Sequence, residues 1–475
     1  MEARLKESLN AIFKPRSVAI IGASNNVNRW GYSTVRNMLL AGYRHGLYPI
    51  NPNESEIQGI KCYARLDDVP EPVDLAIIVV NTSLISDVID DCAKNKVKGG
   101  IVITAGFAEI SSEGAALQEK LTQKSKAAGF HFIGPNCWGI WSSEGNVNTV
   151  FGKDMQFRKG PITFLSQSGT LGEYFYNGAA ENGFGASKFI SCGNQSCIEF
   201  NDLLEYLGDD PTTEVIAAYV EDVKDGRRFL NIARAITPHK PILLFKAGSS
   251  DASARAVKSH TASMAGNDRV FDAACRQAGV LRFDDFMEMF RVAYALCYQP
   301  LPKSNRIGVI SPGGGFCVTT AEICSKMGME LPEMSPEAQK QLLAQMTDFA
   351  PPPLNPIDSI GRKHMSAYQE IIEIVAGQDY IDGIIMTPRI TQFERRLRPD
   401  KMVRGIELAE RAALVPEKFG IPMICANEHE LAGPMFEIYK RHNIPFYDNP
   451  MDCAKVMKGL VAYGTWKRKW QAQQA

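Results

Sequence analysis

A histidine within a run of small, hydroxyl-bearing residues is the sequence feature with the clearest chemical potential. His260 lies in residues 258–266 (KSHTASMAG), after the Ser-rich stretch 248–253. An imidazole without bulky neighbours is accessible, and it can act as a nucleophile that carries a phosphoryl group between two sites. No second His or Cys stands nearby at ligand spacing, so metal binding is not indicated. A lone histidine, however, is more often a surface or capping residue.

A carboxylate and a helix start could complete such a site. Glu221 ends the apolar strand expected over residues 215–220, where it would face the site side of the sheet. There it could hold the second ring nitrogen of a histidine. The run SQSGTLG over residues 166–172 opens a helix, and its small residues leave backbone N–H groups and hydroxyls facing outward, which suits a phosphoryl group. The simpler alternatives are a solvated loop acid and a plain N-cap.

A glycine-containing turn near the N-terminus offers a second anion site. The apolar run 16–24 (RSVAIIGAS) ends in a turn at Gly22 that leads into a helix-like stretch. Free N–H groups and the helix dipole favour phosphate there, and Arg29 adds a cation. The next glycine, Gly31, comes nine residues later, so the spacing is not GxGxxG, and residues 50–53 (INPN) lack a ribose-reading acid. The sequence favours a nucleotide-type ligand over NAD, with a purely structural turn as the alternative.

Three further turns follow apolar, strand-like runs. They are residues 104–109 (TAGFAE), 134–139 (GPNCWG) and 311–315 (SPGGG). Ligands of open sheets bind beyond the carboxyl ends of strands, and small residues let a ligand approach the backbone. The first two, taken singly, are more often structural turns. The third could cradle a phosphate or form a tight turn at a subunit contact.

Apolar runs of strand length alternate with helix-like stretches and predict an α/β fold. The strands expected first cover residues 16–24, 47–51, 73–80, 100–104 and 131–134. The pattern restarts over residues 160–166, 188–190, 215–220 and 242–246, and again over 306–311, 382–387, 422–426 and 445–447. Apolar runs without alternation, separated by helices, are typical of parallel sheets covered on both faces. We therefore predict three α/β domains, over residues 1–145, 146–298 and 299–465.

Composition sets bounds on the function. The chain has 475 residues, 52 Lys and Arg, 53 Asp and Glu, and a formal net charge of −1, so nothing indicates nucleic-acid binding. The apolar runs are too short for a membrane span, and the N-terminus lacks the apolar centre of a signal peptide. Eleven scattered cysteines without a CxxC pair indicate reduced thiols. We therefore expect a cytoplasmic protein.

Taken together, the motifs resemble the α subunit of the ADP-forming (NDP-forming) acyl-CoA synthetases, in the succinyl-CoA synthetase superfamily. The matching segments are residues 22–24 (GAS), 48–52 (YPINP), 103–109 (ITAGFAE), 134–137 (GPNC), 166–169 (SQSG), 219–221 (YVE), 225–228 (DGRR), 259–261 (SHT) and 355–358 (NPID). The resemblance covers essentially the whole chain. It implies a Rossmann-like CoA-binding domain followed by two flavodoxin-like, doubly wound parallel-sheet domains.

The resemblance also implies a role for each candidate residue. His260 aligns with the phosphorylated histidine, and Glu221 aligns with the glutamate that steadies it. The implied phosphate-binding residues are Ser168, Gly169, Thr170, Ser259 and Thr261. The implied CoA-binding residues are Gly22, Ser24, Arg29, Gly31, Asn51, Pro52, Val79, Ala105, Gly106, Phe107 and Asn136. No metal site is implied in this chain.

The family needs an ATP-grasp module that binds ATP or ADP with Mg²⁺. The three α/β units occupy the chain, so we expect a separate ATP-grasp β subunit, most simply in an α2β2 assembly. The implied reaction joins a carboxylic acid, acetate or another small acid, to CoA at the expense of ATP. It passes through a phosphohistidine and an acyl phosphate.

Three departures from the family pattern keep a second reading open. Ala262 stands where glycine is commoner, Cys197 stands where the family tends to place Asp, and Trp138 is bulky for its position. A non-catalytic or regulatory CoA-binding protein of the same fold is therefore the alternative. A NAD(P) oxidoreductase is a third option, and the missing acid after the second strand argues against it.

Overall fold

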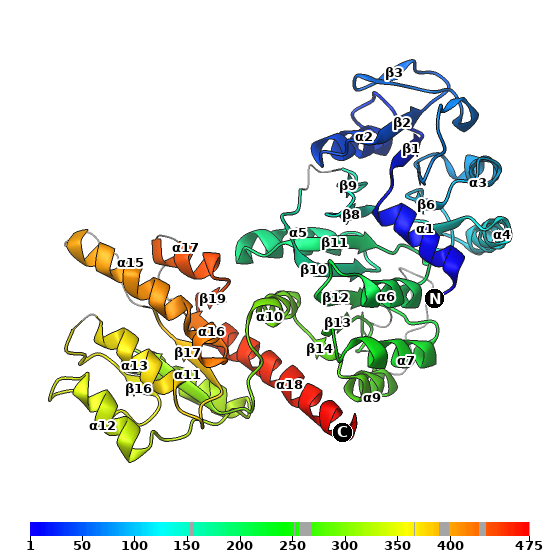
Figure 1. The fold of residues 1–475 in the computed structure, drawn as a ribbon. Helices are drawn as coiled ribbons and strands as arrows, with labels where there is room; N and C mark the ends of the chain where they lie inside the picture. The colour runs from blue at the N-terminus through cyan, green and yellow to red at the C-terminus, as the bar shows by residue number, and fades with distance from the viewer. Residues whose placement is uncertain are drawn as a thin grey trace. The chain divides into compact units, whose positions relative to one another are not determined.

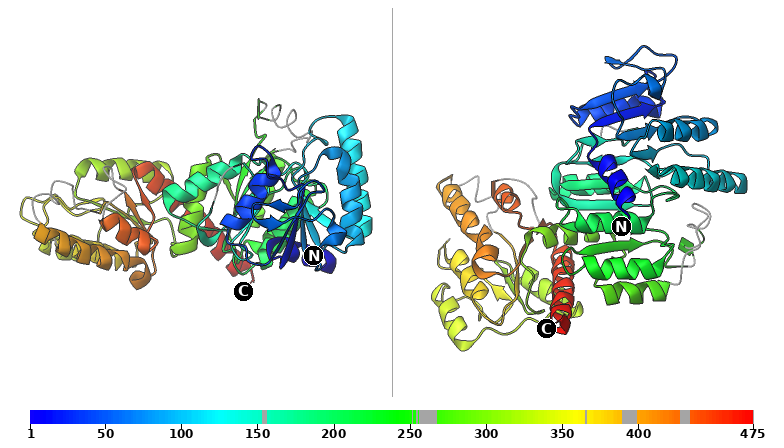
Figure 2. Two further views of the ribbon diagram at one scale, coloured as in Figure 1. Left: turned by 90° about the horizontal axis from the view of Figure 1, so that it is seen from above. Right: turned by 45° about the vertical axis from the view of Figure 1, so that its right-hand side comes forward.

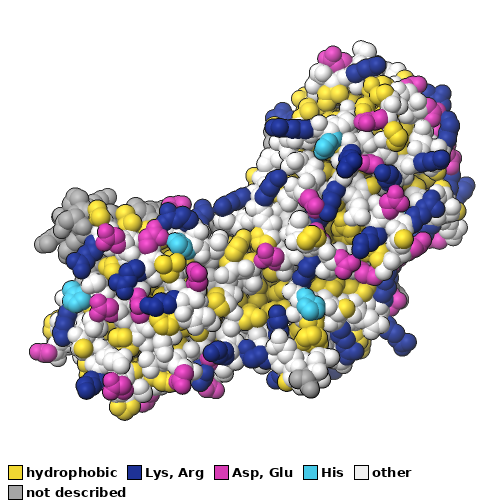
Figure 3. All heavy atoms as spheres, viewed as in Figure 1, with side chains coloured by type: hydrophobic (Ala, Val, Ile, Leu, Met, Phe, Trp, Pro, Cys, Tyr) yellow, Lys and Arg dark blue, Asp and Glu magenta, His cyan; other side chains and the backbone are white. Residues whose placement is uncertain are grey.

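The computed structural model describes residues 1–152, 156–250, 252–253, 255, 268–364, 366–388, 399–426 and 434–474. The chain forms two compact units, Met1–Phe286 and Met287–Ala475, and each is described here by itself (Figure 1). Within the described residues, no helix is both long enough and apolar enough to cross a membrane. On the face drawn in Figure 3, basic and acidic side chains of the described residues are interspersed.

The first unit begins with a five-stranded parallel sheet of order β2-β1-β5-β6-β7. Its strands are β1 (Ser17–Ile21), β2 (Gly46–Ile50), β5 (Leu75–Ile78), β6 (Gly99–Val102) and β7 (His131–Ile133), and a small hairpin, β3 (Glu56–Ile57) and β4 (Ile60–Lys61), lies apart from them. Every residue of β1 is buried, as an apolar run without alternation requires. The chain leaves β1 for β2 on one side and later reaches β5 on the other. This reversal creates a crevice at the carboxyl ends of β1 and β5.

Helices cover both faces of this sheet (Figures 1 and 2). They are α1 (Ala3–Phe13), α2 (Trp30–Leu40), α3 (Ile85–Lys94) and α4 (Ser112–Ala128). Apolar residues of α1 and α2 pack in one core cluster with alternate residues of β1 and β5. Residues of α3 and α4 pack in a second cluster with the remaining ones. Burial on both faces thus explains the unbroken apolar runs.

The second sheet of this unit has the order β14-β13-β12-β10-β11-β8-β9. Its parallel strands are β10 (Lys159–Ser166), β11 (Ala186–Ser191), β12 (Val215–Val220), β13 (Ile242–Lys246) and β14 (Leu281–Phe283), and the strands β8 (Ile140–Ser142) and β9 (Val147–Asn148) run antiparallel to their neighbours. Its helices are α5 (Leu171–Asn182), α6 (Phe200–Asp209), α7 (Gly226–Ile236) and α9 (Asp268–Ala278). The strand order reverses beside β10, which places a second crevice between β10 and β12.

The hairpin of β8 and β9 is a feature that the sequence patterns missed. It pairs through β8 with β11, so the chain enters the second sheet before residue 145. Its strands are only three and two residues long, too short to show a period in the sequence. Both sheets also contribute residues to one hydrophobic cluster, such as Ile133 from the first sheet and Ile190 from the second. The predicted domain boundaries themselves remain predictions.

The second unit is built on a five-stranded parallel sheet of order β16-β15-β17-β18-β19. Its strands are β15 (Ile307–Ser311), β16 (Ile357–Asp358), β17 (Gly383–Met386), β18 (Met423–Ala426) and β19 (Phe446–Tyr447). Its helices are α10 (Phe286–Tyr298), which begins on the last residue of the first unit, α11 (Gly314–Lys326), α12 (Pro336–Ala344), α13 (Ala367–Ala376), α15 (Pro399–Ala413), α16 (Val415–Phe419), α17 (Pro434–Arg441) and α18 (Pro450–Gln474). The predicted α/β class, with mostly parallel sheets, is confirmed.

Candidate active site

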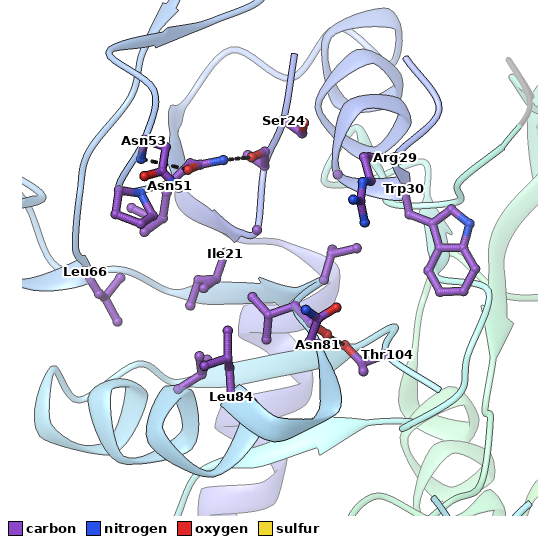
Figure 4. A pocket seen from close by; sticks show the side chains of 18 of the residues that line it. Ile21, Ser24, Arg29, Trp30, Asn51, Asn53, Leu66, Asn81, Leu84 and Thr104 are labelled. Carbon is purple, nitrogen blue, oxygen red and sulfur yellow. Dashed lines mark hydrogen bonds between the residues drawn. The ribbon is translucent and has the colours of Figure 1, made fainter. Parts of the chain in front are cut away.

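A cleft of about 880 Å³ opens at the crevice of the first sheet (Figure 4). It lies at the carboxyl ends of β1, β2, β5 and β6, where the topology reverses. Eight residues that the sequence assigned to this site line it: Gly22, Ser24, Arg29, Gly31, Asn51, Pro52, Val79 and Ala105. The structure thus brings together residues spread over more than eighty positions of the chain.

Two glycines allow the turn after β1 to pack closely against its neighbours. Gly22 has φ +94°, and a Cβ there would lie 2.4 Å from the carbonyl oxygen of Val79. A Cβ on Gly31 would lie 2.1 Å from the carbonyl oxygen of Gly22, because the first turn of α2 sits directly on this loop. Arg29 is the N-cap of α2, and its side chain forms no capping hydrogen bond. The helix dipole therefore faces the cleft without a capping side chain.

Asn51 acts as a brace between two loops of the cleft. Its side-chain amide donates to the carbonyl oxygen of Ala23 over 2.8 Å, and its side-chain oxygen accepts the N–H of Asn53 over 2.9 Å (Figure 4). Both ends of this side chain are thus engaged. Asn51 holds the loop in shape where a dinucleotide-binding protein would place a ribose-reading acid.

The cleft is chemically divided. In Figure 4, the apolar side chains of Ile21, Leu66 and Leu84 lie on one side and Arg29 lies on the other. Arg29 is exposed, so its charge is available to a ligand phosphate. Apolar side chains can pack against the flat face of a nucleobase. The cleft can therefore hold a ligand that has a phosphate end and an aromatic end.

Three predicted residues lie outside the lining of this cleft. They are Gly106, Phe107 and Asn136. The side chain of Phe107 is fully buried in the hydrophobic core, so only its backbone could face a ligand. Gly106 has φ +110°, and Asn136 occupies a loop between the two sheets of the unit. Their assignment to the site stays a prediction.

A second constellation lies at the crevice between β10 and β12. The loop after β10 is folded on itself, because the Ser166 hydroxyl donates to the Ser168 carbonyl over 2.5 Å and accepts its N–H over 3.2 Å. The Ser168 and Thr170 hydroxyl oxygens are 3.2 Å apart, and Thr170 is the N-cap of α5 without a side-chain capping bond. Hydroxyl groups and a helix start thus meet at one edge, as an anion site requires.

Gln167 ties this loop to Glu221, and the sequence did not single it out. Its side-chain oxygen accepts the N–H of Glu221 over 2.7 Å and that of Asp222 over 3.0 Å. Its amide donates to the Asp222 carbonyl over 2.8 Å. The position of this polar residue between two serines of the SQSG motif was the available signal. Gln167 places the end of β12, with Glu221, beside the start of α5.

Glu221 has an aromatic neighbour, Tyr219, and a basic neighbour, Lys246. Glu221 is buried, and burial together with the neighbouring Glu221 carboxylate raises the pKa of Tyr219. The Nζ of Lys246 donates to the carbonyl oxygens of Glu221 and Ala247 over 2.7 and 2.6 Å. Burial lowers the pKa of Lys246. Lys246 is thus a buried link between the ends of β12 and β13.

The departures from the family pattern fall at different depths. Cys197 is buried in the apolar cluster of α3 and α4. Trp138 packs on the start of α5, where a Cβ on Gly169 would lie 2.9 Å from its Cβ, and its indole N–H donates to the Phe151 carbonyl over 3.0 Å. His260, Ser259, Thr261 and Ala262 lie outside the described residues. Among the described residues, no three His, Cys, Asp or Glu side chains form a group that could hold a metal ion.

The fold and the cleft define the class of this protein: an α/β protein that combines a CoA-binding domain with a succinyl-CoA-ligase-like domain. The family model described as CoA binding domain matches residues 16–142. The model described as succinyl-CoA ligase like flavodoxin domain matches residues 159–296.

Several relatives match most of the chain. The α subunit of ADP-forming acetate–CoA ligase II from Pyrococcus furiosus is 34% identical over 460 residues, which cover 95% of this chain and 97% of that subunit. An ADP-forming acetate–CoA ligase of Methanocaldococcus jannaschii is 38% identical over 74% of this chain and 49% of its own length. The structure of a dinucleotide forming acetyl-coenzyme A synthetase 1 from Ca. Korarchaeum cryptofilum, in complex with phosphate and ADP, is 28% identical with a TM-score of 0.86 over 99% of each chain. This chain belongs to the family of ADP-forming acetate–CoA ligase α subunits.

Proposed function

We propose that the chain is the α subunit of an ADP-forming acyl-CoA synthetase, which converts a carboxylic acid, CoA and ATP reversibly into acyl-CoA, ADP and phosphate. The cleft at the first crevice carries this proposal, because eight of the eleven predicted CoA residues line it and the chain belongs to a CoA-ligase family. Acetate or another small carboxylic acid is the proposed substrate, in keeping with the P. furiosus relative.

CoA would bind with its phosphates at the start of α2. Arg29 and the backbone N–H groups around Gly22 would neutralise phosphate charge. The base would rest on the apolar side formed by Ile21, Leu66 and Leu84. The thiol end would then run toward the loop at Ala105 and the second crevice.

In the proposed mechanism, the phosphoryl group travels through His260. An imidazole nitrogen of His260 attacks the γ-phosphorus of ATP, and ADP leaves. A carboxylate oxygen of the acid then attacks the phosphohistidine, so the P–N bond breaks and an acyl phosphate forms. The CoA thiol loses its proton, attacks the acyl carbon and expels phosphate. Glu221 would orient His260, and the start of α5 at Ser168, with Ser259 and Thr261, would stabilise the phosphate charge.

We propose that ATP, with Mg²⁺, binds to an ATP-grasp β subunit in an α2β2 assembly. Two observations support a separate chain. The relative that this chain matches over 97% of its length is an α subunit, whereas the chain spans about half of the M. jannaschii ligase. We also propose a cytoplasmic location, in keeping with eleven cysteines that are scattered along the sequence without a CxxC pair.

Incorporation of labelled phosphate tests the proposed function. The purified chain with its co-purifying subunit is incubated with radiolabelled phosphate and a panel of acyl-CoAs. We expect a label that is acid-labile, base-stable and absent from H260N, while H260N still binds CoA, because only the carrier nitrogen is removed. The acyl-CoA that gives the strongest phosphate label on the protein identifies the preferred carboxylic acid. An unlabelled wild-type protein that still binds CoA would instead support the regulatory CoA-binding alternative.

A further inference from the structure

Three loops from the two sheets of the first unit meet between the cleft and the second crevice. They follow β6, β7 and β11, and they comprise residues 104–109, 134–137 and 192–196. The N–H of Asn194 donates to the Pro135 carbonyl over 2.8 Å, and the N–H of Asn136 donates to the Thr104 carbonyl over 2.9 Å. The loop that contains Ala105 is thus linked to the second sheet.

Glu109 and Asn194 form the side-chain link between these loops. One carboxylate oxygen of Glu109 accepts the N–H groups of Gly106 and Phe107 over 2.6 and 3.1 Å. The other oxygen accepts the Asn194 side-chain amide over 2.6 Å. The carboxylate therefore shapes its own loop with one oxygen and binds the second sheet with the other.

The neighbours of this pair fix its orientation. The Asn194 amide also donates to the side-chain oxygen of Gln118 over 2.8 Å, and its oxygen accepts the Asn136 amide over 3.2 Å. Burial opposes the charge of Glu109, but the hydrogen bonds from Gly106, Asn194 and Phe107 outweigh it and lower the pKa of Glu109. Glu109 is thus a pure acceptor at neutral pH, and Asn194 must present its amide nitrogen.

We propose that Glu109 and Asn194 are positioning residues that set the loop at residues 105–107 against the loop at residues 192–196. In the proposed function, on which this inference rests, the first loop guides the thiol end of CoA and the second borders the site where the acyl phosphate forms. The pair would hold the CoA thiol at the distance and angle at which it attacks the acyl phosphate, because small misplacements of reacting groups lower the rate strongly. Neither residue touches the reacting atoms.

Exchange of donor and acceptor provides a test. In E109Q, the new amide group turns its N–H groups toward other donors, either the Asn194 side-chain amide or the N–H groups of Gly106 and Phe107. In N194D, the new carboxylate faces the carboxylate of Glu109, and the two negative charges repel each other. The double variant E109Q/N194D restores a donor opposite an acceptor. E119Q is the matched control, because Glu119 lies exposed on α4 and accepts only from the Gln123 side chain in the described structure.

We expect kcat for acyl-CoA formation to fall about tenfold to a hundredfold in E109Q and in N194D, the size expected when a hydrogen bond to a charged group is lost. Phosphohistidine formation and CoA affinity should change less than about threefold, because His260 and the phosphate end of the cleft are left intact. The double variant should recover kcat to within about threefold of wild type, and E119Q should match wild type.

Three results would overturn the proposal. They are single variants with normal kcat, single variants that lose phosphohistidine formation as well, and a double variant no faster than the product of the single effects. If a single variant does not fold, the double variant decides alone: a folded double variant with kcat near wild type supports the pair, and a folded but slow one refutes it. A wild-type protein without ligase activity would refute the proposed function instead.

Discussion

At the scale of single residues, Gly22 controls whether the cleft exists. Its φ of +94° and the 2.4 Å approach of a would-be Cβ to the Val79 carbonyl leave room for no side chain. Glu109 shows a second kind of control, since one carboxylate serves two loops through its separate oxygens. In both cases one residue sets the geometry of a loop.

We expect G22A to lose CoA binding, because the new Cβ would displace the turn after β1. The positive φ at this position should also lower the free energy of unfolding by about 1–3 kcal/mol. The matched control is G226A, because a Cβ at Gly226 meets nothing within 4 Å and this residue opens α7. Thermal shift with CoA and urea unfolding measure both effects. Normal CoA binding by G22A would show that the turn after β1 is not part of the site.

At the scale of elements, helix starts and strand ends supply the chemistry. The starts of α2 and α5 lie at the crevices of the two sheets in the first unit, and neither N-cap side chain forms a capping bond. Gln167 ties the end of β12 to the loop before α5 through three hydrogen bonds. Within each sheet, the parallel topology gathers strand ends and helix starts at one edge, so residues far apart in the chain meet there.

Salt bridges also link helices in the second unit. Glu373 on α13 accepts from Arg411 on α15 over 2.8 Å and from Lys418 on α16 over 2.7 Å. Burial raises the pKa of Glu373, but the hydrogen bonds from Lys418, Gln369 and Arg411 lower it more, to about 2. A carboxyl whose folded pKa is depressed stabilises the fold above its ordinary pKa and loses that stabilisation as the pH falls toward 2.

E373Q should therefore be less stable than wild type at pH 7, by about 1 kcal/mol once solvent screening is included. The difference should shrink as the pH falls from about 4.5 toward 2, because the wild-type carboxyl becomes protonated in both states. Urea unfolding at several pH values measures it. A difference that persists unchanged at the lowest pH would show that the charge of Glu373 is not the cause.

At the scale of the whole molecule, the proposed function divides the reaction between two chains. This chain has the cleft that suits CoA, and the proposed partner has the nucleotide. We expect the purified α chain alone to bind CoA but to form no acyl-CoA from ATP, and addition of the β subunit to restore turnover. Coupled assays of ADP release, with and without the partner, test this. Turnover by the α chain alone would contradict the proposed ATP-grasp subunit.

The sequence by itself determined the fold class and the membership of the family. Unbroken apolar runs separated by helices fit a parallel sheet covered on both faces, and the turns at Gly22 and Ser168 mark the strand ends where such sheets bind ligands. These signals are local, because each depends on residues within one strand, turn or helix. The roles assigned to His260 and its neighbours remain predictions.

Only the tertiary structure decided which distant residues meet. Lys188 lies in a buried strand, and its Nζ reaches Asp210 over 2.6 Å, a pairing that no spacing rule contains. For the same reason, the sequence did not predict the short hairpin of β8 and β9, the hydrogen bonds of Gln167 to the end of β12, or the contact of Glu109 with Asn194. Side-chain contacts between separate elements depend on how sheets twist and pack, and the order of residue types along one chain does not carry that information.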